Sequence, residues 1–462
     1  MAFRVGSWGS AALVAASLCG ACGGDDDPPG IGNFDNLSCD AVTETANCIE
    51  IDTPEALLEE AVLVGADTTL VLSSGTFVLT NAVTIRQDGV QLVGQGMEDT
   101  VLSFGTATTQ FNGVDVVGDD FVVQDLTVLD APKDGIRVEE SDGVTFRRIR
   151  ATWTNEGDST NGAYGIYPVK SQNVLVEDSR AENASDAGLY VGQCQNVIVR
   201  RNTVRGNVAG LEIENTQYAD VYENLAEDNT GGIVVFDLPG NPIVGRDVRL
   251  RDNTIRGNNR TNFAPSGTVG VIPAGTGTFA LASRRVEITG NTYENNQTVD
   301  IAILSGLIVE EDTTRWTLQE SALVGDYDDL GLLPGATAGT IMNFRSENIV
   351  VANNSHTGSG TDPDTTKEMG FLVFLIYGVN PVDSVVYDAL GESMYDAETA
   401  ANNSNDNRIC VGGNTMGTFG SLDVETQASS PGSAILSLDT APFAPFDCTT
   451  LNGGPVAEVV LP

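Results

Sequence analysis

The sequence predicts an all-β fold, a parallel solenoid with three inward-facing columns of apolar residues. A block of about two dozen residues recurs along the middle of the chain, with near-identical segments opening at Gly188, Gly210 and Gly232. Blocks this short cannot bury an apolar face alone, so they have to stack on one another. Apolar and polar residues alternate inside each block, which is typical of strands. Hairpin signals are absent and connections are short, which favours a parallel coil over a two-sheet sandwich.

The first strand of each block contributes two inward positions. The first of them is occupied by Phe121, Val144, Val174, Val197, Ala219, Val248, Val286 and Ile349. Asparagine follows the second position by three residues at Asn202, Asn224, Asn253 and Asn291, where we expect a left-handed turn and a structural ladder of side chains. The third inward column lies two residues further on and ends at Tyr293.

The chain divides into five expected segments. These are a lipoprotein signal peptide at 1–22, a flexible acidic and Gly/Pro-rich tether at 23–38, an N-terminal cap and first coils at 39–117, regular repeats at 118–306, and irregular C-terminal coils with a cap at 307–462. Excursions interrupt the repeats at 155–163, 238–245, 257–277 and 307–347. Excursions of a solenoid gather on one side, where they shape a binding face.

A short helix is predicted for the N-terminal cap. Thr53 is a capping residue followed by proline, and Leu57, Leu58, Ala61 and Val62 form its apolar stripe. Such a helix would cover the open end of the first coil and prevent strand edges from pairing with other chains.

Two features stand beyond the regular repeats. The run from Phe371 to Ile376 is uniformly apolar and predicts a buried strand. His356, the only histidine, is expected in a polar loop, which argues against histidine-based catalysis.

The N-terminus predicts export. Arg4, the apolar run 11–18 and the segment ending at Cys22 resemble a bacterial lipoprotein signal. The resemblance implies lipidation of Cys22 and an envelope protein anchored to a membrane, facing the periplasm or the cell surface. An ordinary signal cleaved after Ala21 is the alternative.

Cysteine usage agrees with export. Apart from the two signal cysteines, Cys39 and Cys48 lie close together near the start, Cys410 and Cys448 lie near the end, and Cys194 lies inside a repeat. Two disulfides at the caps and one buried thiol are the simplest partition.

Charge limits the partners. The formal net charge is -41, from 64 acidic and 23 basic residues, and such a field repels nucleic acid. No spacing indicates a zinc site, no metal or cofactor is assigned, and Ca²⁺ bound by clustered acids stays open. A monomer is expected.

Four segments carry a family resemblance. Residues 164–169, 186–193, 207–215 and 229–240 resemble a bacterial family of exported right-handed parallel β-helix repeat proteins. The resemblance implies the pectate-lyase fold, which polysaccharide lyases, hydrolases and mannuronan epimerases share, and a link to carbohydrate.

The strands that follow the glycines carry the candidate site. With Leu189 and Val191 inward, and likewise Ile166 and Val169, the residues between them face outward in columns about 4.8 Å apart. The catalytic candidates are Asp186, Tyr190, Glu212, Glu214 and Asp237. The candidates for substrate binding are Arg137, Tyr167, Lys170, Asn215 and Phe236. Aromatic rings stack on sugars while carboxylates accept hydroxyl hydrogen bonds.

Two functions follow as alternatives. One is a protein that binds polysaccharide and acts on it by lyase, epimerase or hydrolase chemistry, with paired acids or Tyr190 moving protons. The other is a non-catalytic scaffold for protein partners, with Glu212 and Glu214 as solvated strand faces, Asp186 as a turn cap and Asp237 fixing a bend. Whether the chain is an enzyme stays open.

Overall fold

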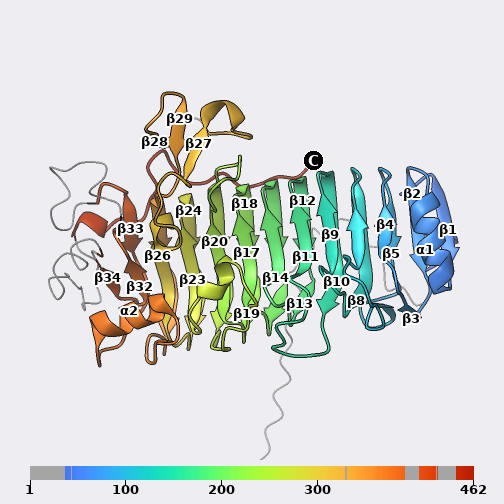
Figure 1. Cartoon of the computed structure of the whole chain (residues 1–462), viewed down its shortest axis with the longest axis horizontal. Coiled ribbons are helices and arrows are strands. Elements are labelled where there is room, and N and C mark those ends of the chain that lie inside the picture. Colours follow the sequence, from blue (N-terminus) through green and yellow to red (C-terminus); the bar gives the residue numbers. More distant parts are fainter. Residues whose placement is uncertain (1–36, 43, 328–329, 391–404, 423, 425–443) are drawn as a thin grey trace, which may run out of the picture. The chain divides into compact units, whose positions relative to one another are not determined.

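The chain forms a parallel β-helix, as its repeats predict. The computed structural model describes residues 37–42, 44–327, 330–390, 405–422, 424 and 444–462. The expected signal peptide and Cys22 lie outside them. Residues Asn36–Pro462 form one compact unit. Successive coils lie side by side along the stack, coloured from blue to red in sequence order (Figure 1).

One side of the coil is an eleven-stranded parallel sheet, called sheet B here. Its strands are β4 (Val83–Ile85), β7 (Val114–Val116), β9 (Ile136–Glu139), β11 (Tyr164–Val169), β14 (Ala187–Gly192), β17 (Ala209–Glu214), β20 (Gly231–Phe236), β23 (Thr276–Leu281), β26 (Val299–Leu304), β32 (Val385–Tyr387) and β34 (Phe419–Ser421).

The other two sides form one twenty-stranded sheet, called sheet A. They are joined because β8 (Phe121–Leu129) and β10 (Asp142–Thr152) run through the corner between them. The first side also holds β1 (Asn47–Ile51), β2 (Thr68–Leu72), β5 (Gln91–Val93), β12 (Gln172–Glu177), β15 (Gln195–Arg200), β18 (Gln217–Tyr222), β21 (Arg246–Arg251), β24 (Arg284–Thr289), β30 (Glu347–Ala352) and β33 (Ile409–Gly412). The second side holds β3 (Gly75–Val78), β6 (Thr100–Ser103), β13 (Arg180–Glu182), β16 (Thr203–Arg205), β19 (Leu225–Glu227), β22 (Thr254–Arg256), β25 (Thr292–Glu294) and β31 (Ser355–Thr357).

The predicted inward columns are confirmed by the strand register. Val144 pairs with Phe121 and Val174, and Val197 continues the column one coil later. These side chains are fully buried in one continuous core. The third column does not end at Tyr293, because Tyr293 pairs with His356 of the next coil.

His356 is therefore a core residue of β31, and its prediction in a polar loop is wrong. Its ring stacks on Tyr293 with centroids 5.3 Å apart, and its Nδ1 lies 2.9 Å from Asp300 Oδ2. A three-residue polar strand with one inward residue gave no sign of burial in the sequence. The histidine ring lies inside the coil against the core residue Tyr293, so it faces away from the outer face of the sheets.

The asparagine ladder is confirmed, but its backbone prediction is wrong. Asn202, Asn224 and Asn253 are buried and hydrogen-bonded coil to coil. The left-handed conformation belongs to the residue before each of them, as at Arg201 and Glu223. That corner residue points to solvent, while the asparagine turns inward and satisfies backbone groups.

The N-terminal cap contains α1 (Pro54–Leu63), with Thr53 Oγ1 accepting from the Ala56 amide. Leu57 and Ala61 are buried, whereas Val62 is 67% exposed. Val62 was placed wrongly in the stripe, because the first coil meets only the narrow face that Leu57 and Ala61 share. A short 3-10 helix, η1 (Cys39–Ala41), precedes β1.

A second helix, α2 (Glu368–Tyr377), occupies the run predicted as a buried strand. That prediction is wrong, since Phe371, Phe374 and Leu375 are exposed and only one face of the helix packs on sheet B. The excursions hold η2 (Thr268–Val271), η3 (Gly306–Ile308) and η4 (Glu320–Ala322), and an antiparallel sheet of β27 (Thr317–Gln319), β28 (Leu333–Pro334) and β29 (Thr340–Met342). Another 3-10 helix, η6 (Ala444–Phe446), follows β34.

Two disulfides staple the ends of the coil. Cys39 bonds Cys48 and Cys410 bonds Cys448, while Cys194 is a buried free thiol. Disulfides persist in oxidising compartments, which fits an exported protein. Among the residues described, no helix combines the length and apolar character needed to cross a membrane.

Candidate functional site

The predicted outward columns lie on sheet B. Tyr167 pairs with Arg137, and Tyr190 pairs with Glu212. Gly192 pairs with Glu214, which pairs with Phe236. Tyrosine and glutamate of neighbouring coils therefore point to the same side of the sheet. Val169 also faces outward, pairing with Glu139 and Gly192, so its inward placement is wrong. Pro168 takes the inward position because it pairs with the core residue Val138.

Three tyrosines meet on this face. Tyr164, Tyr167 and Tyr190 each contact the other two, with ring centroids 4.5 to 4.9 Å apart. Sequence reasoning missed Tyr164, because alternation places it inward with Ile166. It stands at the first position of β11, where the corner of the coil turns its side chain outward.

Four carboxyl groups adjoin the rings. We name Asp134, Asp186, Glu212 and Glu214, together with the three tyrosines, the acid-tyrosine cluster. Glu212 is 1% exposed and its Oε1 has no hydrogen-bond partner within the described residues. Asp186 Oδ1 is also buried and has no hydrogen-bond partner within the described residues. In contrast, Glu214 Oε1 accepts from Asn241 Nδ2 at 3.0 Å. A buried carboxyl oxygen without a hydrogen-bond partner destabilises the folded state, so its presence in a structure needs a functional or structural reason.

Burial changes the acidity of this cluster. It raises the pKa of Asp186 to about 7, with the charges of Glu214 and Asp134 acting in the same direction. Complete burial, followed by the charges of Asp186 and Glu214, holds the pKa of Glu212 well above its usual range. Burial also raises the pKa of Asp134, against the nearby Lys133. The cluster thus keeps protonated carboxyls near neutral pH, which can donate protons, beside groups that can accept them.

Tyr190 reaches Glu214 because position 192 has no side chain. A Cβ added at Gly192 would lie 2.2 Å from the Tyr190 hydroxyl oxygen. The tyrosine hydroxyl hydrogen-bonds Glu214, which offsets part of the effect of burial on the pKa of that acid. The ring of Tyr190 therefore lies flat across its own strand.

We expect Gly192→Ala to lower the free energy of unfolding by about 1–3 kcal/mol, because the methyl group overpacks the Tyr190 ring. Chemical denaturation measures this. Gly65→Ala is the control, since its Cβ would meet nothing within 4 Å. Equal unfolding midpoints for both variants would contradict the predicted position of Tyr190.

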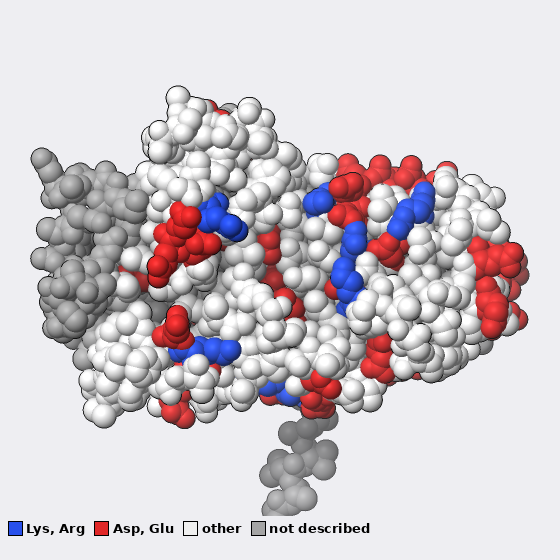
Figure 2. All heavy atoms as spheres, in the orientation of Figure 1, with Lys and Arg blue, Asp and Glu red and all other residues white. Residues whose placement is uncertain are grey.

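The cluster is open at one end and covered at the other. Arg137 and Lys170, on the β9 and β11 side, have side chains 26% and 45% exposed. Figure 2 shows Lys and Arg atoms over β9 and β11, and Asp and Glu atoms among uncharged ones over β14 and β17. A Cβ on Gly267 would lie 3.6 Å from Asp186 Oδ2, so the 257–277 excursion closes over that carboxyl.

Beyond β17 the outer face is apolar and covered. Val234 and Phe236 are buried, and Phe236 packs on Phe279. Val269, from η2, and Val373, from α2, belong to the same apolar cluster. Phe236 is thus part of a packed layer and not of a substrate-binding surface, and the outward residues that stay partly exposed, such as Arg137 and Tyr167, lie over β9 and β11.

Two other predicted site residues serve the fold. Asn215 is fully buried, and its Nδ2 donates to the Ile243 carbonyl while its Oδ1 accepts from the Leu238 amide. Asp237 is 1% exposed, accepts from the Gly245 amide and lies 3.9 Å from Arg284 Nη1. Burial raises the pKa of Asp237 to about 7, yet the side chain accepts from the Gly245 amide and holds the end of the 238–245 excursion against the coil.

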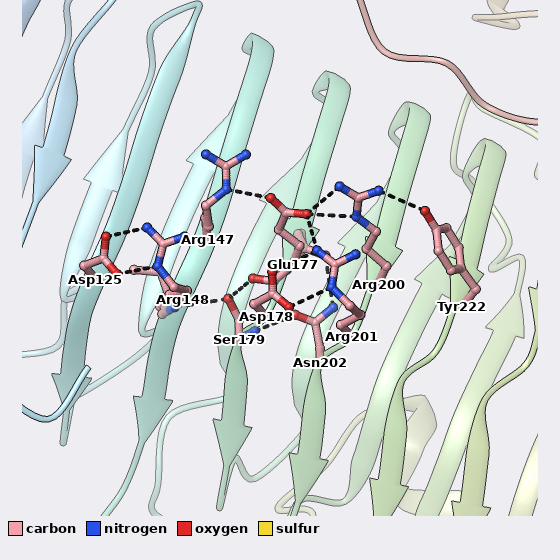
Figure 3. A network of polar contacts seen from close by, with 12 residues as sticks. Asp125, Arg147, Arg148, Glu177, Asp178, Ser179, Arg200, Arg201, Asn202 and Tyr222 are labelled. Atoms are coloured by element: carbon pink, nitrogen blue, oxygen red, sulfur yellow. Dashed lines mark hydrogen bonds and ion pairs between the residues drawn. The ribbon is translucent and has the colours of Figure 1, made fainter. Parts of the chain in front are cut away.

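The outer face of sheet A carries arginines and acids that form ion pairs between neighbouring coils. Glu177 accepts from Arg147 at 2.6 Å and from Arg200 and Arg201 at 2.8 Å (Figure 3). Burial would raise the pKa of Glu177, but the hydrogen bonds and charges of Arg147 and Arg200 lower it below its usual range. Opposite charges alternate from coil to coil, so this wall is explained by cross-strand pairing in register.

Across the described ranges, no three His, Cys, Asp or Glu side chains are grouped in a way that could hold a metal ion.

Comparisons with known proteins give the fold. Residues 112–272 match the family model described as the right handed beta helix region. The A-module of the mannuronan C-5 epimerase AlgE4 of Azotobacter vinelandii is 17% identical, with 72% of this chain and 88% of that chain covered and a TM-score of 0.44. The alginate lyase of Paenibacillus sp. str. FPU-7 is 14% identical, covering 56% and 91%, at 0.32. The Dettilon tailspike protein is 15% identical, covering 73% and 62%, at 0.39. A search of curated proteins finds no match. Function has to be derived from the side chains of this chain.

Proposed function

We propose that the outer face of sheet B from β9 to β17 binds a polysaccharide and that the acid-tyrosine cluster acts on it. The observation that carries the proposal is the register that places Tyr167, Tyr190, Glu212 and Glu214 on one face. Tyr167 is half-buried, so one part of the ring packs on Tyr164 and Tyr190 and another faces solvent. Such rings stack on apolar sugar faces, and polar groups beside them fix the hydroxyls.

The proposed chemistry is proton transfer at or beside a glycosidic bond. Glu212, whose pKa burial holds well above its usual range, is the proposed proton donor. Asp186, with a pKa of about 7, exists in both forms and serves as the partner acid or base. Tyr190 contacts Glu214 and is the proposed group that passes a proton between substrate and carboxyl. Lyase, epimerase and hydrolase reactions all use this step, and the products separate them.

The test screens uronate and neutral glycans for binding and for three products: unsaturated ends, new reducing ends and epimerised residues. We expect Glu212→Gln and Tyr190→Phe to reduce turnover at least about a hundredfold, the usual loss for a general acid or base. Glu227→Gln, on the outer wall of sheet A, is the matched control and should retain activity. Turnover unchanged in both site variants would remove the catalytic proposal.

A scaffold for protein partners is the second candidate. It is favoured by the outer face of sheet B beyond β17, which the excursions and α2 cover with a packed apolar layer. Blank glycan arrays, together with a partner lost on deletion of the antiparallel sheet β27–β29, would support it.

The proposed location is the cell envelope, with the exported chain held by lipid on Cys22. Metabolic labelling with a fatty acid, lost in Cys22→Ser, tests the anchor.

A further inference from the structure

A cavity of about 440 Å³ lies at a corner of the coil, apart from the acid-tyrosine cluster. Arg246, Arg284, Arg285 and Arg408 line it, together with Asn348, Asn452 and one acid, Glu347, whose charge is paired with Arg345. Its volume is within the range of about 300–1,000 Å³ that small-molecule sites occupy. Four guanidinium groups in one cavity are unusual in a chain with a net charge of -41.

The repeat explains how these arginines meet. Arg285, Asn348 and Arg408 occupy equivalent corner positions of successive coils, because the residues after them pair in register from Val286 to Ile349 and Ile409. All three have left-handed backbone, with φ of 50°, 53° and 55°. Successive strands lie about 4.8 Å apart, so their side chains leave the corner in one row.

Hydrogen bonds hold the cavity wall in place. Asn348 Nδ2 donates to the Asn452 carbonyl at 3.0 Å, and the Asn452 amide donates to Asn348 Oδ1 at 2.9 Å. Arg285 Nη1 donates to the same Asn452 carbonyl at 2.8 Å. The Cys410–Cys448 disulfide joins the strand after Arg408 to the tail that carries Asn452. A wall fixed in this way lowers the ordering cost of binding.

The arginines differ in what they contact. Arg285 pairs with Asp247 at 2.8 Å, and Arg246 contacts Asp247 at 2.5 Å. Arg284 is 2% exposed. Arg408 is exposed and makes no ion pair with any residue that the structure describes. The Arg408 guanidinium is therefore the group that can contact a ligand directly. The other three arginines add to the positive electrostatic potential of the cavity.

We infer that this cavity binds a sugar-sized ligand carrying an oxyanion, a carboxylate or a sulfate, with Arg408 as the direct contact. Guanidinium groups match the planar oxygens of such groups and stay charged at every physiological pH. The net negative charge of the chain repels anions, so binding of an anion in this cavity depends on the local row of arginines. The site is independent of the proposed function of sheet B and stands if that face binds nothing.

Isothermal titration of the full chain with glucuronate, glucose 6-sulfate and inorganic sulfate tests the inference. We expect saturable binding of one of the two sugars at millimolar concentration or below, and the sugar that binds identifies the oxyanion. Arg408→Gln should weaken it at least tenfold. Arg205→Gln, an exposed arginine of sheet A, removes the same charge elsewhere and should leave binding unchanged.

Two results would overturn the inference. One is that neither sugar shows saturable binding. Binding of inorganic sulfate without either sugar has the same meaning, because the cavity would then not accept a sugar. The other is equal affinity in Arg408→Gln and in the unmodified chain, with both shown to be folded by circular dichroism. Glu212→Gln is expected to bind as the unmodified chain does, which separates this site from the acid-tyrosine cluster.

Discussion

Replacing Asn224 with alanine is expected to destabilise the coil by about 4 kcal/mol, because each buried partner left unsatisfied costs about 1–3 kcal/mol. Asn224 Nδ2 donates to the Val199 carbonyl at 2.9 Å and to Asn253 Oδ1 at 3.0 Å. Its Oδ1 accepts from the amide and the side chain of Asn202, both at 3.0 Å. One substitution therefore breaks bonds to the coils on both sides at once.

Denaturant unfolding and hydrogen exchange at the Asn202 amide measure the effect. Coils of a solenoid are stabilised by their neighbours, so we expect exchange to rise mainly in the coils beside position 224. Asn155→Ala is the control, because Asn155 is exposed in an excursion. A stability within about 0.5 kcal/mol of the unmodified chain, the range of ordinary surface substitutions, would mean that the ladder is dispensable.

The sequence predicted those parts of the fold that repeat. Val144 and Val197 could be assigned to one column because the same pattern recurs in each coil, and register then follows from stacking. Phe371 to Ile376 could not be assigned, because six consecutive apolar residues have neither the period of a strand nor that of a helix. The burial of His356 could not be predicted, because a three-residue strand with one inward residue has too few positions to show an alternating pattern.

The candidate site was predicted only where alternation decides orientation. Tyr190 and Glu212 face one side because they are outward in strands that pair. The conformation of Tyr190 across Gly192 and the turn of Tyr164 at the start of β11 depend on packing at a corner, which alternation does not describe. The closure of the 257–277 excursion over Asp186 depends on contacts between segments far apart in sequence, and an excursion without a period gives no sign of them.

Raising the pH from 5 to 8 is expected to destabilise the chain through the same carboxyls. Burial raises the pKa of Asp186 to about 7, and it also raises the pKa of Glu212 and Glu214. A group whose pKa is higher in the folded state binds its proton more tightly there. Its stabilising effect is complete below the unfolded value of about 4 and is lost as the pH rises through the folded value.

The size of the effect follows from Asp186 alone. Its pKa rises from 3.8 to about 7. At 1.36 kcal/mol per unit this corresponds to roughly 4 kcal/mol between pH 4 and pH 8, an upper value because a partly opened excursion would hydrate the group. Melting temperature should therefore fall from pH 5 upward, with the contribution of Asp186 levelling off above pH 7.

Glu212→Gln separates this cause from general repulsion among the acidic residues. The substitution keeps the shape of the side chain and removes one raised pKa. We expect its melting temperature to fall less between pH 5 and pH 8 than that of the unmodified chain. Glu227→Gln changes the net charge by the same amount on the sheet A wall and should keep the original slope. If all three proteins lose the same stability over this range, the carboxyls of the cluster are not the titrating groups, because a loss common to all of them would come from repulsion over the whole surface.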